Sequence, residues 1–421
     1  MYHHYLSGGS VMPKRSSEKN ICLKAASILA AVLLCLGGFF VFSGCAMPDN
    51  GTKVDNISAD AEKTYYIKEE NSHISLSASD VSAKSAILIE ASSGEVLWSK
   101  NADQRLPMAS TTKIMTALVA IENGDVGRTV SVSPEAVGVE GSSVYLYPNE
   151  KMTLGDLIYA MLLESANDAA AAIAIEVGGS IEGFAKMMNQ KAENLGLRDT
   201  HFENPHGLDG ETHYTTAHEL AIIAREAYSN DTLKSIFSTY KKTIPLNETE
   251  GVRLLINHNK LLKSYEGATG IKTGFTKKSG RCLVSAAERG GLSLIAVTLN
   301  APNDWQDHKN MLDHGFSLIE SKTLCTAGEY TYAVAVSGGK DDHVIVKNSD
   351  TVRLILPRNG KKIEYKIELP RFLYAPVQEG EVVGRIAFYL DGKEIASSDL
   401  VTASSVDKFP IKKRIFDFFK F

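Results

Sequence analysis

The chain has 421 residues, enough for two or three domains, and its 44% hydrophobic and 23% charged residues are an ordinary balance for a globular protein. The formal net charge is −5, so the composition gives no reason to expect a nucleic-acid partner.

The first 47 residues predict an export signal. Basic residues lead into an uncharged apolar run at 25–42, and small residues follow it. The run is also long enough for an uncleaved membrane anchor. Ser43-Gly44-Cys45-Ala46 resembles a bacterial lipobox, which makes Cys45 a candidate for lipidation, although an ordinary cleavage site has the same small residues. We therefore expect an extracytoplasmic, membrane-associated protein.

Residues 48–80 are rich in Asp, Glu, Ser, Asn and Lys and show little periodicity, so we expect a flexible linker. Apolar runs at 85–90 and 95–98 flank a Gly-containing turn and predict a hairpin. Helical spacing follows at 181–195 and 216–228.

The residues at 267–300 return to strands, and 305–321 predicts a closing helix. The order predicts an α/β (α+β) domain over 81–325, with helices on a sheet and a helical lobe. Alternating runs at 332–336, 352–356 and 385–390 predict a small, sandwich-like all-β domain over 326–403.

Residues 404–421 form a basic, aromatic-rich tail. Its apolar residues at 411, 415, 418 and 419 share one face if the tail is helical, which suits an anionic membrane surface. The alternative is that these aromatic residues fold back onto the β-domain.

Ser110 stands at the start of an apolar helix, and Lys113 lies on the same face one turn later. A serine hydroxyl needs a neighbouring base to become a nucleophile, and a lysine can be that base if its pKa is lowered. Free N–H groups at a helix start can hold an oxyanion. Ser-x-x-Lys occurs five times in the chain, but only the one at Ser110 opens a strongly apolar helix.

Two further motifs raise the significance of Ser110. Ser165-Ala166-Asn167 follows an apolar run, and Lys272-Thr273-Gly274 precedes an apolar strand. Ser-x-x-Lys, Ser-x-Asn and Lys-Thr-Gly, in this order, are the signature of class A β-lactamases and penicillin-binding proteins. Each motif alone is weak, and the ordered set is specific.

The stretch at 82–322 resembles the low-molecular-weight penicillin-binding proteins of the D-alanyl-D-alanine carboxypeptidase type, which includes penicillin-binding proteins 5 and 6. Matching motifs lie at 109–117, 163–169, 204–208 and 270–276, and the β-domain resembles that family's C-terminal domain. The resemblance implies a serine acyltransferase fold without metal or cofactor. It also implies that the partners are D-Ala-D-Ala-terminated peptidoglycan stem peptides and β-lactam antibiotics.

The resemblance also assigns roles to the motif residues. Ser110 would be the acylated nucleophile and Lys113 its general base. Ser165 would relay a proton, and Asn167 would bind the substrate amide. Lys272 would supply positive charge, Thr273 and Gly274 would line the strand beside the substrate, and the N–H groups of Ser110 and Phe275 would form the oxyanion hole.

One departure from the family pattern leaves alternatives open. Some relatives carry an arginine before the last helix of the domain to hold the substrate carboxylate, whereas residues 301–306 here contain none. A D,D-endopeptidase is therefore a second interpretation, a β-lactamase a third, and a degenerate penicillin-sensing or wall-binding protein the non-enzymatic one.

Histidines and cysteines predict no further site. The histidines at 201, 206, 213 and 218 lie near glutamates but lack zinc-binding spacing, so no metal is expected. Outside the signal region only Cys282 and Cys325 remain, and we expect no disulfide between them.

Overall fold

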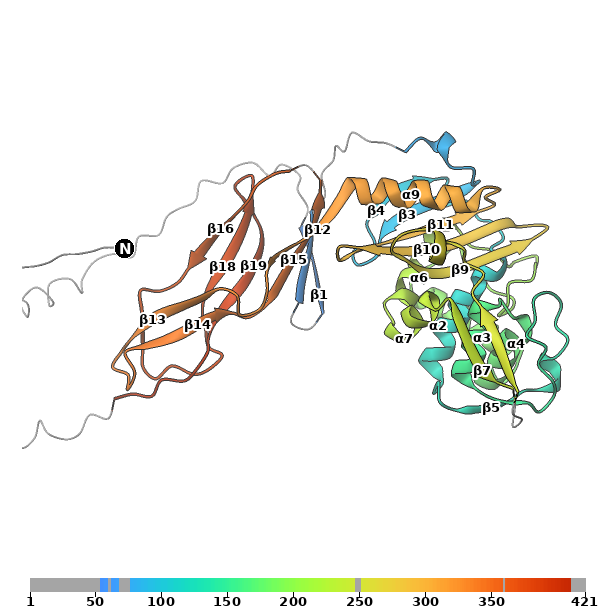
Figure 1. Ribbon diagram of the computed structural model, residues 1–421, viewed down its shortest axis with the longest axis horizontal. Helices are drawn as coiled ribbons and strands as arrows, with labels where there is room; N and C mark the ends of the chain where they lie inside the picture. The colour runs from blue at the N-terminus through green and yellow to red at the C-terminus, as the bar shows by residue number, and fades with distance from the viewer. Residues whose placement is uncertain (1–53, 60–61, 68–75, 247–250, 359, 410–421) are drawn as a thin grey trace, which may run out of the picture. The chain divides into compact units, whose positions relative to one another are not determined.

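The computed structural model describes residues 54–59, 62–67, 76–246, 251–358 and 360–409, which form a larger α/β domain and a smaller all-β domain (Figure 1). Among these residues no helix is both long and apolar enough to cross a membrane. The expected export signal at 1–47, with Cys45, lies outside the described residues, as does the tail from 410 onward.

The larger domain is built on a five-stranded antiparallel sheet in the order β4-β3-β11-β10-β9. Its strands are β3 (Ser85–Glu90), β4 (Val96–Lys100), β9 (Ala268–Thr276), β10 (Gly280–Arg289) and β11 (Leu292–Leu299). The predicted hairpin at 85–98 and the strands at 267–300 are confirmed. β9 and β4 are the two edge strands, so β9 has a neighbour on one side within the sheet.

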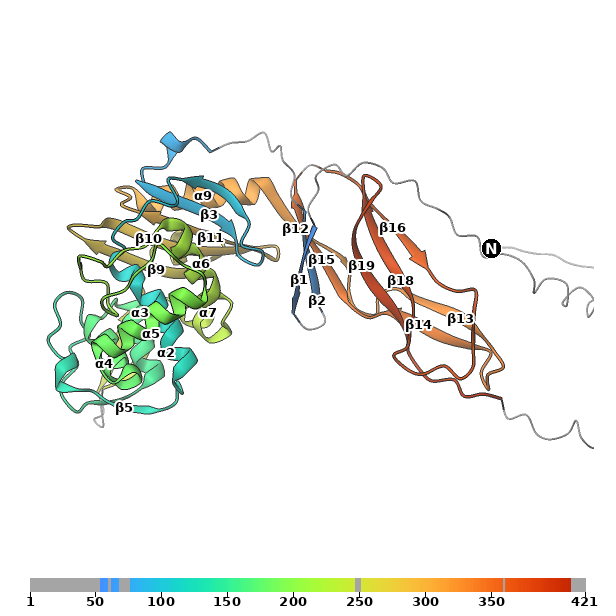
Figure 2. The ribbon, with the colours of Figure 1, turned by 180° about the vertical axis from the view of Figure 1, so that it is seen from behind.

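One long helix covers one face of this sheet. The buried side chains of α9 (Asp304–Leu318) include Met311 and Leu312, which belong to one apolar cluster with Leu88 and Leu294 of the sheet. Figures 1 and 2 show α9 lying along the sheet from both sides of the molecule.

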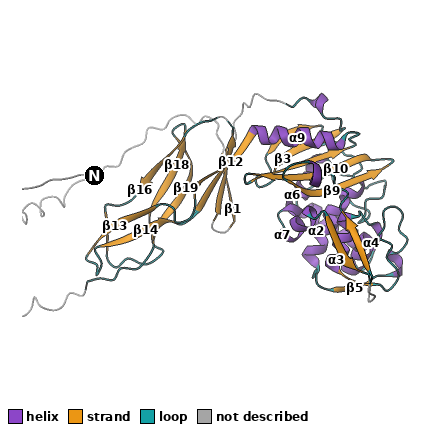
Figure 3. Cartoon of the chain, viewed as in Figure 1, coloured by secondary structure: helices purple, strands orange, loops and turns teal. Residues whose placement is uncertain are grey.

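The other face packs on a helical lobe (Figure 3). Its helices are α2 (Lys113–Asn123), α3 (Leu154–Leu163), α4 (Asn167–Gly178), α5 (Ile181–Asn194), α6 (Ala217–Tyr228) and α7 (Asp231–Ser238). Short elements complete the domain: η1 (Ala78–Asp80), η2 (Ala109–Thr112), η3 (Pro134–Ala136), α8 (Leu261–Ser264), the pair β5 (Thr129–Ser131) and β6 (Lys151–Thr153), and the hairpin β7 (Lys241–Pro245) and β8 (Val252–Ile256). The helices predicted at 181–195 and 216–228 are confirmed as α5 and α6.

The smaller domain is all-β. Its two sheets share one apolar cluster, and the six-stranded sheet contributes to a second one. One sheet has the order β1-β2-β15-β12 and the other β16-β18-β19-β14-β13-β17. The strands are β1 (Val54–Ala59), β2 (Glu62–Ile67), β12 (Ile319–Cys325), β13 (Thr331–Ser337), β14 (His343–Asn348), β15 (Thr351–Pro357), β16 (Ile363–Glu368), β17 (Phe372–Tyr374), β18 (Val382–Leu390) and β19 (Lys393–Thr402). Leu354 from the first sheet and Phe388 from the second both belong to the shared cluster.

Two expected boundaries differ from the structure. The stretch 48–80 was expected to be a linker, but it contains strands β1 and β2, and β2 pairs in parallel with β15. The helix expected at 305–321 ends at Leu318, because the next residues form β12, which pairs with β15. The all-β domain therefore consists of two segments, one before and one after the larger domain in the sequence. The second segment begins at 319, before the expected boundary at 325.

Candidate active site

The fold brings the three motifs together where the edge strand β9 meets η2 and α2. Ser110 is half-buried in the 3₁₀ turn η2, and Lys113 is the first residue of α2. A Cβ added at Gly274 of β9 would lie 3.1 Å from the backbone nitrogen of Ser110. Glycine at this position therefore lets the strand carrying Lys272 approach the nucleophile candidate closely.

Lys113 is fully buried and its amine has three neighbours. Its Nζ lies 3.0 Å from Ser110 Oγ, and it donates to Asn167 Oδ1 at 2.7 Å and to the His206 carbonyl at 2.6 Å. A neutral amine has two N–H bonds and one lone pair. If the amine is neutral and the two carbonyl oxygens accept both N–H bonds, its lone pair is free to accept from the Ser110 hydroxyl, as a general base requires.

The surroundings of Lys113 favour that neutral form. Burial lowers the pKa of Lys113 well below its usual value, the positive charge of Lys272 lowers it further, and Asp168 opposes the shift. A buried ammonium loses the solvation that stabilises its charge, which is why burial acts in this direction. The structure thus places a lysine with a lowered pKa beside the Ser110 hydroxyl.

Lys272 is a second buried lysine on the facing strand. Its Nζ donates to the Thr273 carbonyl at 2.9 Å, and burial lowers its pKa to about 7. Thr273 is half-buried and Phe275 is exposed, so both lie on the accessible part of β9. The free side of an edge strand can pair with an extended peptide, so β9 can bind a substrate backbone beside Ser110.

The Ser-x-Asn motif lies in the turn between α3 and α4. Ser165 has a φ of 60° and is almost fully buried, and Asn167 is the first residue of α4. Asn167 contacts Lys113 directly. Within the described residues, no hydrogen bond joins the Ser165 hydroxyl to Ser110 or Lys113, so the contact of this motif with the base is made by Asn167.

A loop at 203–213 contributes contacts that the motifs did not reveal. The His206 carbonyl accepts from Lys113, and a Cβ added at Gly207 would lie 1.9 Å from the Ala109 carbonyl. Gly207 also has a positive φ of 89°. Both the missing space for a Cβ and this backbone conformation therefore favour glycine at the position. The sequence Asn-Pro-His-Gly-Leu was visible, but its part in the site depends on this long-range contact.

His213 links the same loop to η2. Its Nδ1 accepts from the Glu203 N–H at 3.0 Å, so the proton lies on Nε2, which donates to Thr112 Oγ1 at 2.8 Å. Thr112 Oγ1 in turn donates to the Ala109 carbonyl at 2.8 Å. Burial lowers the pKa of His213 to about 4, which keeps the ring neutral and this chain of bonds intact.

The histidines weighed as metal ligands have other partners here. His201 Nδ1 contacts the Thr212 carbonyl, His218 contacts Asp103, and burial lowers the pKa of His206 to about 3. In the part of the chain that is described, no group of three or more His, Cys, Asp or Glu side chains could hold a metal ion.

Comparison with known families agrees with this geometry. A profile of the D-alanyl-D-alanine carboxypeptidases, peptidase family S11, matches residues 72–303, and a profile of the C-terminal domain of penicillin-binding protein 5 matches residues 320–408. The chain belongs to the S11 D-alanyl-D-alanine carboxypeptidases. The predicted family, fold class and serine-type carboxypeptidase activity are therefore confirmed.

Individual relatives of this carboxypeptidase span most of its length. It is 35% identical to D-alanyl-D-alanine carboxypeptidase DacF of Bacillus subtilis, over 77% of this chain and 86% of that protein. It is 33% identical to DacA of Escherichia coli, over 81% of this chain and 87% of that protein. The structure of penicillin-binding protein 5 from Haemophilus influenzae is 28% identical, covers 78% of this chain and 98% of its own, and has a TM-score of 0.56.

The stretch before α9 of this carboxypeptidase contains no arginine, but an arginine of a neighbouring strand contacts it. Arg281 of β10 reaches that stretch, with its Nε 2.9 Å from Asp304 Oδ1. Arg281 lies directly opposite Phe275 on the neighbouring strand. A cation is thus present beside the accessible end of β9, although it is paired with a carboxylate.

Proposed function

We propose that this carboxypeptidase removes the terminal D-alanine from peptidoglycan stem pentapeptides through an acyl-enzyme on Ser110. Ser110 Oγ attacks the carbonyl of the penultimate D-alanine, and its proton passes to Lys113 Nζ. The peptide C–N bond breaks, and the departing D-alanine amine takes up a proton. Water then hydrolyses the ester and restores Ser110, so that one peptide and one water give one shortened peptide and one D-alanine.

The observation that carries this proposal is the set of three contacts made by Lys113 Nζ. Asn167 Oδ1 and the His206 carbonyl accept from it at 2.7 and 2.6 Å, and Ser110 Oγ lies 3.0 Å away. A nucleophile and a base within hydrogen-bond reach, with the base oriented by further groups, is the arrangement that activates a serine.

The other motif residues take roles that fit their positions. Lys272 supplies positive charge for the substrate carboxylate, and Thr273 and Gly274 belong to the strand that the substrate pairs with. The N–H groups of Ser110 and Phe275 hold the oxyanion. Asn167 binds the substrate amide as well as orienting Lys113, and Ser165 relays a proton to the leaving amine.

The same attack explains how β-lactams would bind. Ser110 would open the lactam ring and keep the product as a stable ester, because no amine leaves the site. Penicillin is therefore a probe for the acylation step by itself.

The substrate assignment is tested with purified enzyme and a pentapeptide ending in D-Ala-D-Ala. Mass spectrometry should show loss of one alanine, and Ser110→Ala should show none. Cleavage of a cross-linked peptide dimer in preference to the pentapeptide would instead support the endopeptidase interpretation, and intact pentapeptide would contradict the proposal.

We also propose that the enzyme acts outside the cytoplasmic membrane and is attached to its surface. The support is the basic flank and apolar run at 1–47, the lipobox-like sequence at Cys45 and the basic, aromatic tail. Labelling of membrane fractions with a fatty-acid probe, compared between wild type and Cys45→Ser, tests the lipid. Equal labelling of the two chains would rule out lipidation at Cys45.

A further inference from the structure

The connection between η3 and β6 lies against the start of α4, and we call its residues 140–150 the 140–150 segment. The Asn167 side chain donates from Nδ2 to the Glu140 carbonyl at 2.5 Å, and the Asn167 backbone N–H donates to the Ser142 carbonyl at 2.7 Å. The backbone of the 140–150 segment therefore fixes the amide group whose oxygen binds Lys113.

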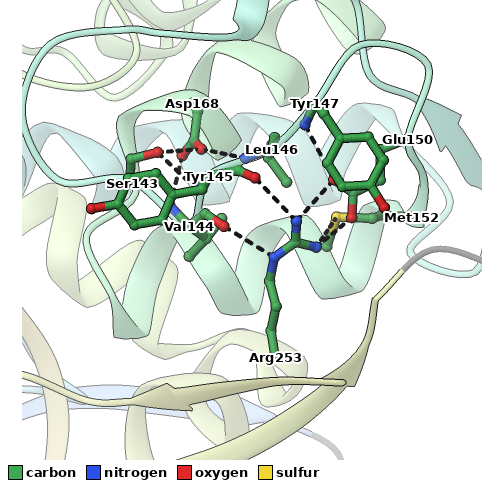
Figure 4. A network of polar contacts seen from close by, with 9 residues as sticks. All are labelled: Ser143, Val144, Tyr145, Leu146, Tyr147, Glu150, Met152, Asp168 and Arg253. Carbon is green, nitrogen blue, oxygen red and sulfur yellow. Dashed lines mark hydrogen bonds and ion pairs between the residues drawn. The ribbon is translucent and has the colours of Figure 1, made fainter. Parts of the chain in front are cut away.

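Asp168, the next residue of α4, holds the same segment from the helix side. Its buried carboxylate accepts from Ser143 Oγ at 2.6 Å, from the Leu146 N–H at 3.0 Å and from the Val144 N–H at 3.3 Å (Figure 4). Hydrogen bonds to a charged acceptor are stronger than those between neutral groups. The segment is thus anchored at several points to the residues that follow Ser165.

Arg253 of β8 holds the segment from the opposite side, as Figure 4 shows. Its guanidinium donates from Nε to the Val144 carbonyl at 3.0 Å and from Nη2 to the Tyr145 carbonyl at 3.3 Å. It also pairs with both oxygens of Glu150, with Nη2 2.9 Å from Oε2. The Glu150 side chain is fully buried and that of Arg253 is 11% exposed, so this ion pair is shielded from water.

The alternation of strand β8 explains why Arg253 faces inward. Arg253 and the buried Leu255 point toward the domain, whereas Val252, Leu254 and Ile256 lie on the exposed face. An arginine on the inward face of a surface hairpin requires a partner, and Glu150 with two carbonyl oxygens supplies it.

We propose that Arg253 is a positioning residue that orients Asn167, and through it the general base Lys113. This inference rests on the proposed acyl-enzyme function. Without Arg253, the Glu150 carboxylate would be buried without its partner, and the carbonyls of Val144 and Tyr145 would lose their donors. The 140–150 segment would then shift, the Asn167 amide would be free to rotate, and the lone pair of Lys113 would lose its direction toward Ser110.

The test is stopped-flow acylation of the full enzyme by benzylpenicillin. Arg253→Gln should lower the first-order acylation constant by roughly 10- to 100-fold, the size expected for misplaced catalytic groups. The constant for noncovalent binding should change less than about twofold, because Arg253 lies outside the ligand's reach in this proposal. Arg385→Gln is the matched control, since Arg385 pairs with Glu368 and Glu394 in the smaller domain. That variant should acylate at the wild-type rate.

The double variant Arg253→Gln with Glu150→Gln separates positioning from stability. It removes the unpaired buried carboxylate, so the melting temperature should recover toward that of wild type, whereas acylation should stay slow because the carbonyl contacts are still missing. Wild-type acylation by either variant below its melting temperature would overturn the proposal, as would a rate that recovers together with stability. Failure of wild type to acylate Ser110 would instead overturn the proposed function.

Discussion

Two lysines are buried within one site, and each would be costly if charged. Burial lowers the pKa of Lys113 far below its usual value and that of Lys272 to about 7. Buried lysines with lowered pKa values contribute little to stability at neutral pH. They are suited to proton transfer and to binding an anion, which favours their charged form. We therefore attribute the burial of Lys113 and Lys272 to their part in the reaction and not to a stabilising effect on the fold.

The lowered pKa of Lys272 determines whether the free energy of unfolding rises or falls with pH. Between about pH 7 and its unfolded pKa of 10.5, the unfolded chain binds a proton at this residue that the folded chain lacks. Stability therefore rises with pH in that window, by roughly 2 kcal/mol between pH 7.5 and 9.5. In urea unfolding, Lys272→Met should lose the part of this rise that Lys272 contributes, while Lys113, whose pKa burial still lowers, keeps its own contribution. Parallel pH profiles for the two chains would contradict the shift.

The loop at 203–213 and the turn η2 act together at the scale of elements. Thr116 Oγ1 donates to the Pro205 carbonyl at 2.6 Å, and the His206 carbonyl accepts from Lys113. Glycine at 207 permits this contact because any side chain there would meet the Ala109 carbonyl. The loop at 203–213 thus helps to fix the position of η2, which carries Ser110.

Gly207→Ala should therefore damage both stability and catalysis. Its Cβ would collide with the residue before Ser110, so penicillin acylation should fall at least tenfold at a temperature where the chain is still folded. Gly196→Ala is the control, because Gly196 also has a positive φ, of 76°, but nothing lies within 4 Å of its added Cβ. The control should lose only about 1 kcal/mol of stability, from backbone strain, and keep the acylation rate. Equal acylation rates in the two variants would contradict the role of the loop.

The sequence predicted the elements whose signals are local. The apolar run after Ser110, the hairpin at 85–98 and the helix α5 each show their periodicity within one stretch of chain. β1 and β2 were missed because their sequences are polar. They pair with each other, but the hairpin joins a sheet only where β2 pairs with β15, almost 300 residues later. The same reason hid the end of α9, since Ile319–Cys325 becomes a strand by pairing with β15.

The residues of the candidate site also fall into two groups, those with a local sequence motif and those without one. Ser110, Lys113, Asn167 and Lys272 were identified by motif, and the structure brings them together. The contacts of His206, His213 and Arg253 were not, because a backbone carbonyl acceptor or an arginine on a hairpin has no signature in the sequence. Such residues are found only once the chain is folded around the motifs.

At the scale of the whole molecule, the tail continues from a structured segment of the smaller domain. Val406 bridges to Val377 and Lys408 to Gly339, so the first residues of the predicted tail at 404–421 belong to the β-domain. The remaining residues, 410–421, carry the basic and aromatic pattern. We expect this part, rather than 404–409, to contact lipid.

A chain shortened to residues 48–421 should therefore sediment with vesicles containing anionic lipid, more weakly as salt is raised. A chain of residues 48–409 should lose this binding and keep its melting temperature, because the β-domain retains all of its described strands. Equal binding by both chains, or unfolding of the shorter one, would show that the tail is structural.

The central claim is that neutral Lys113 activates Ser110 for acylation, and peptide mapping of the penicillin adduct tests it most directly. Wild type should carry one adduct, on Ser110. Lys113→Arg should fold but carry none, because arginine keeps the positive charge and cannot be deprotonated in a protein. An adduct on Ser165, or acylation of the Lys113→Arg enzyme at the wild-type rate, would contradict the account.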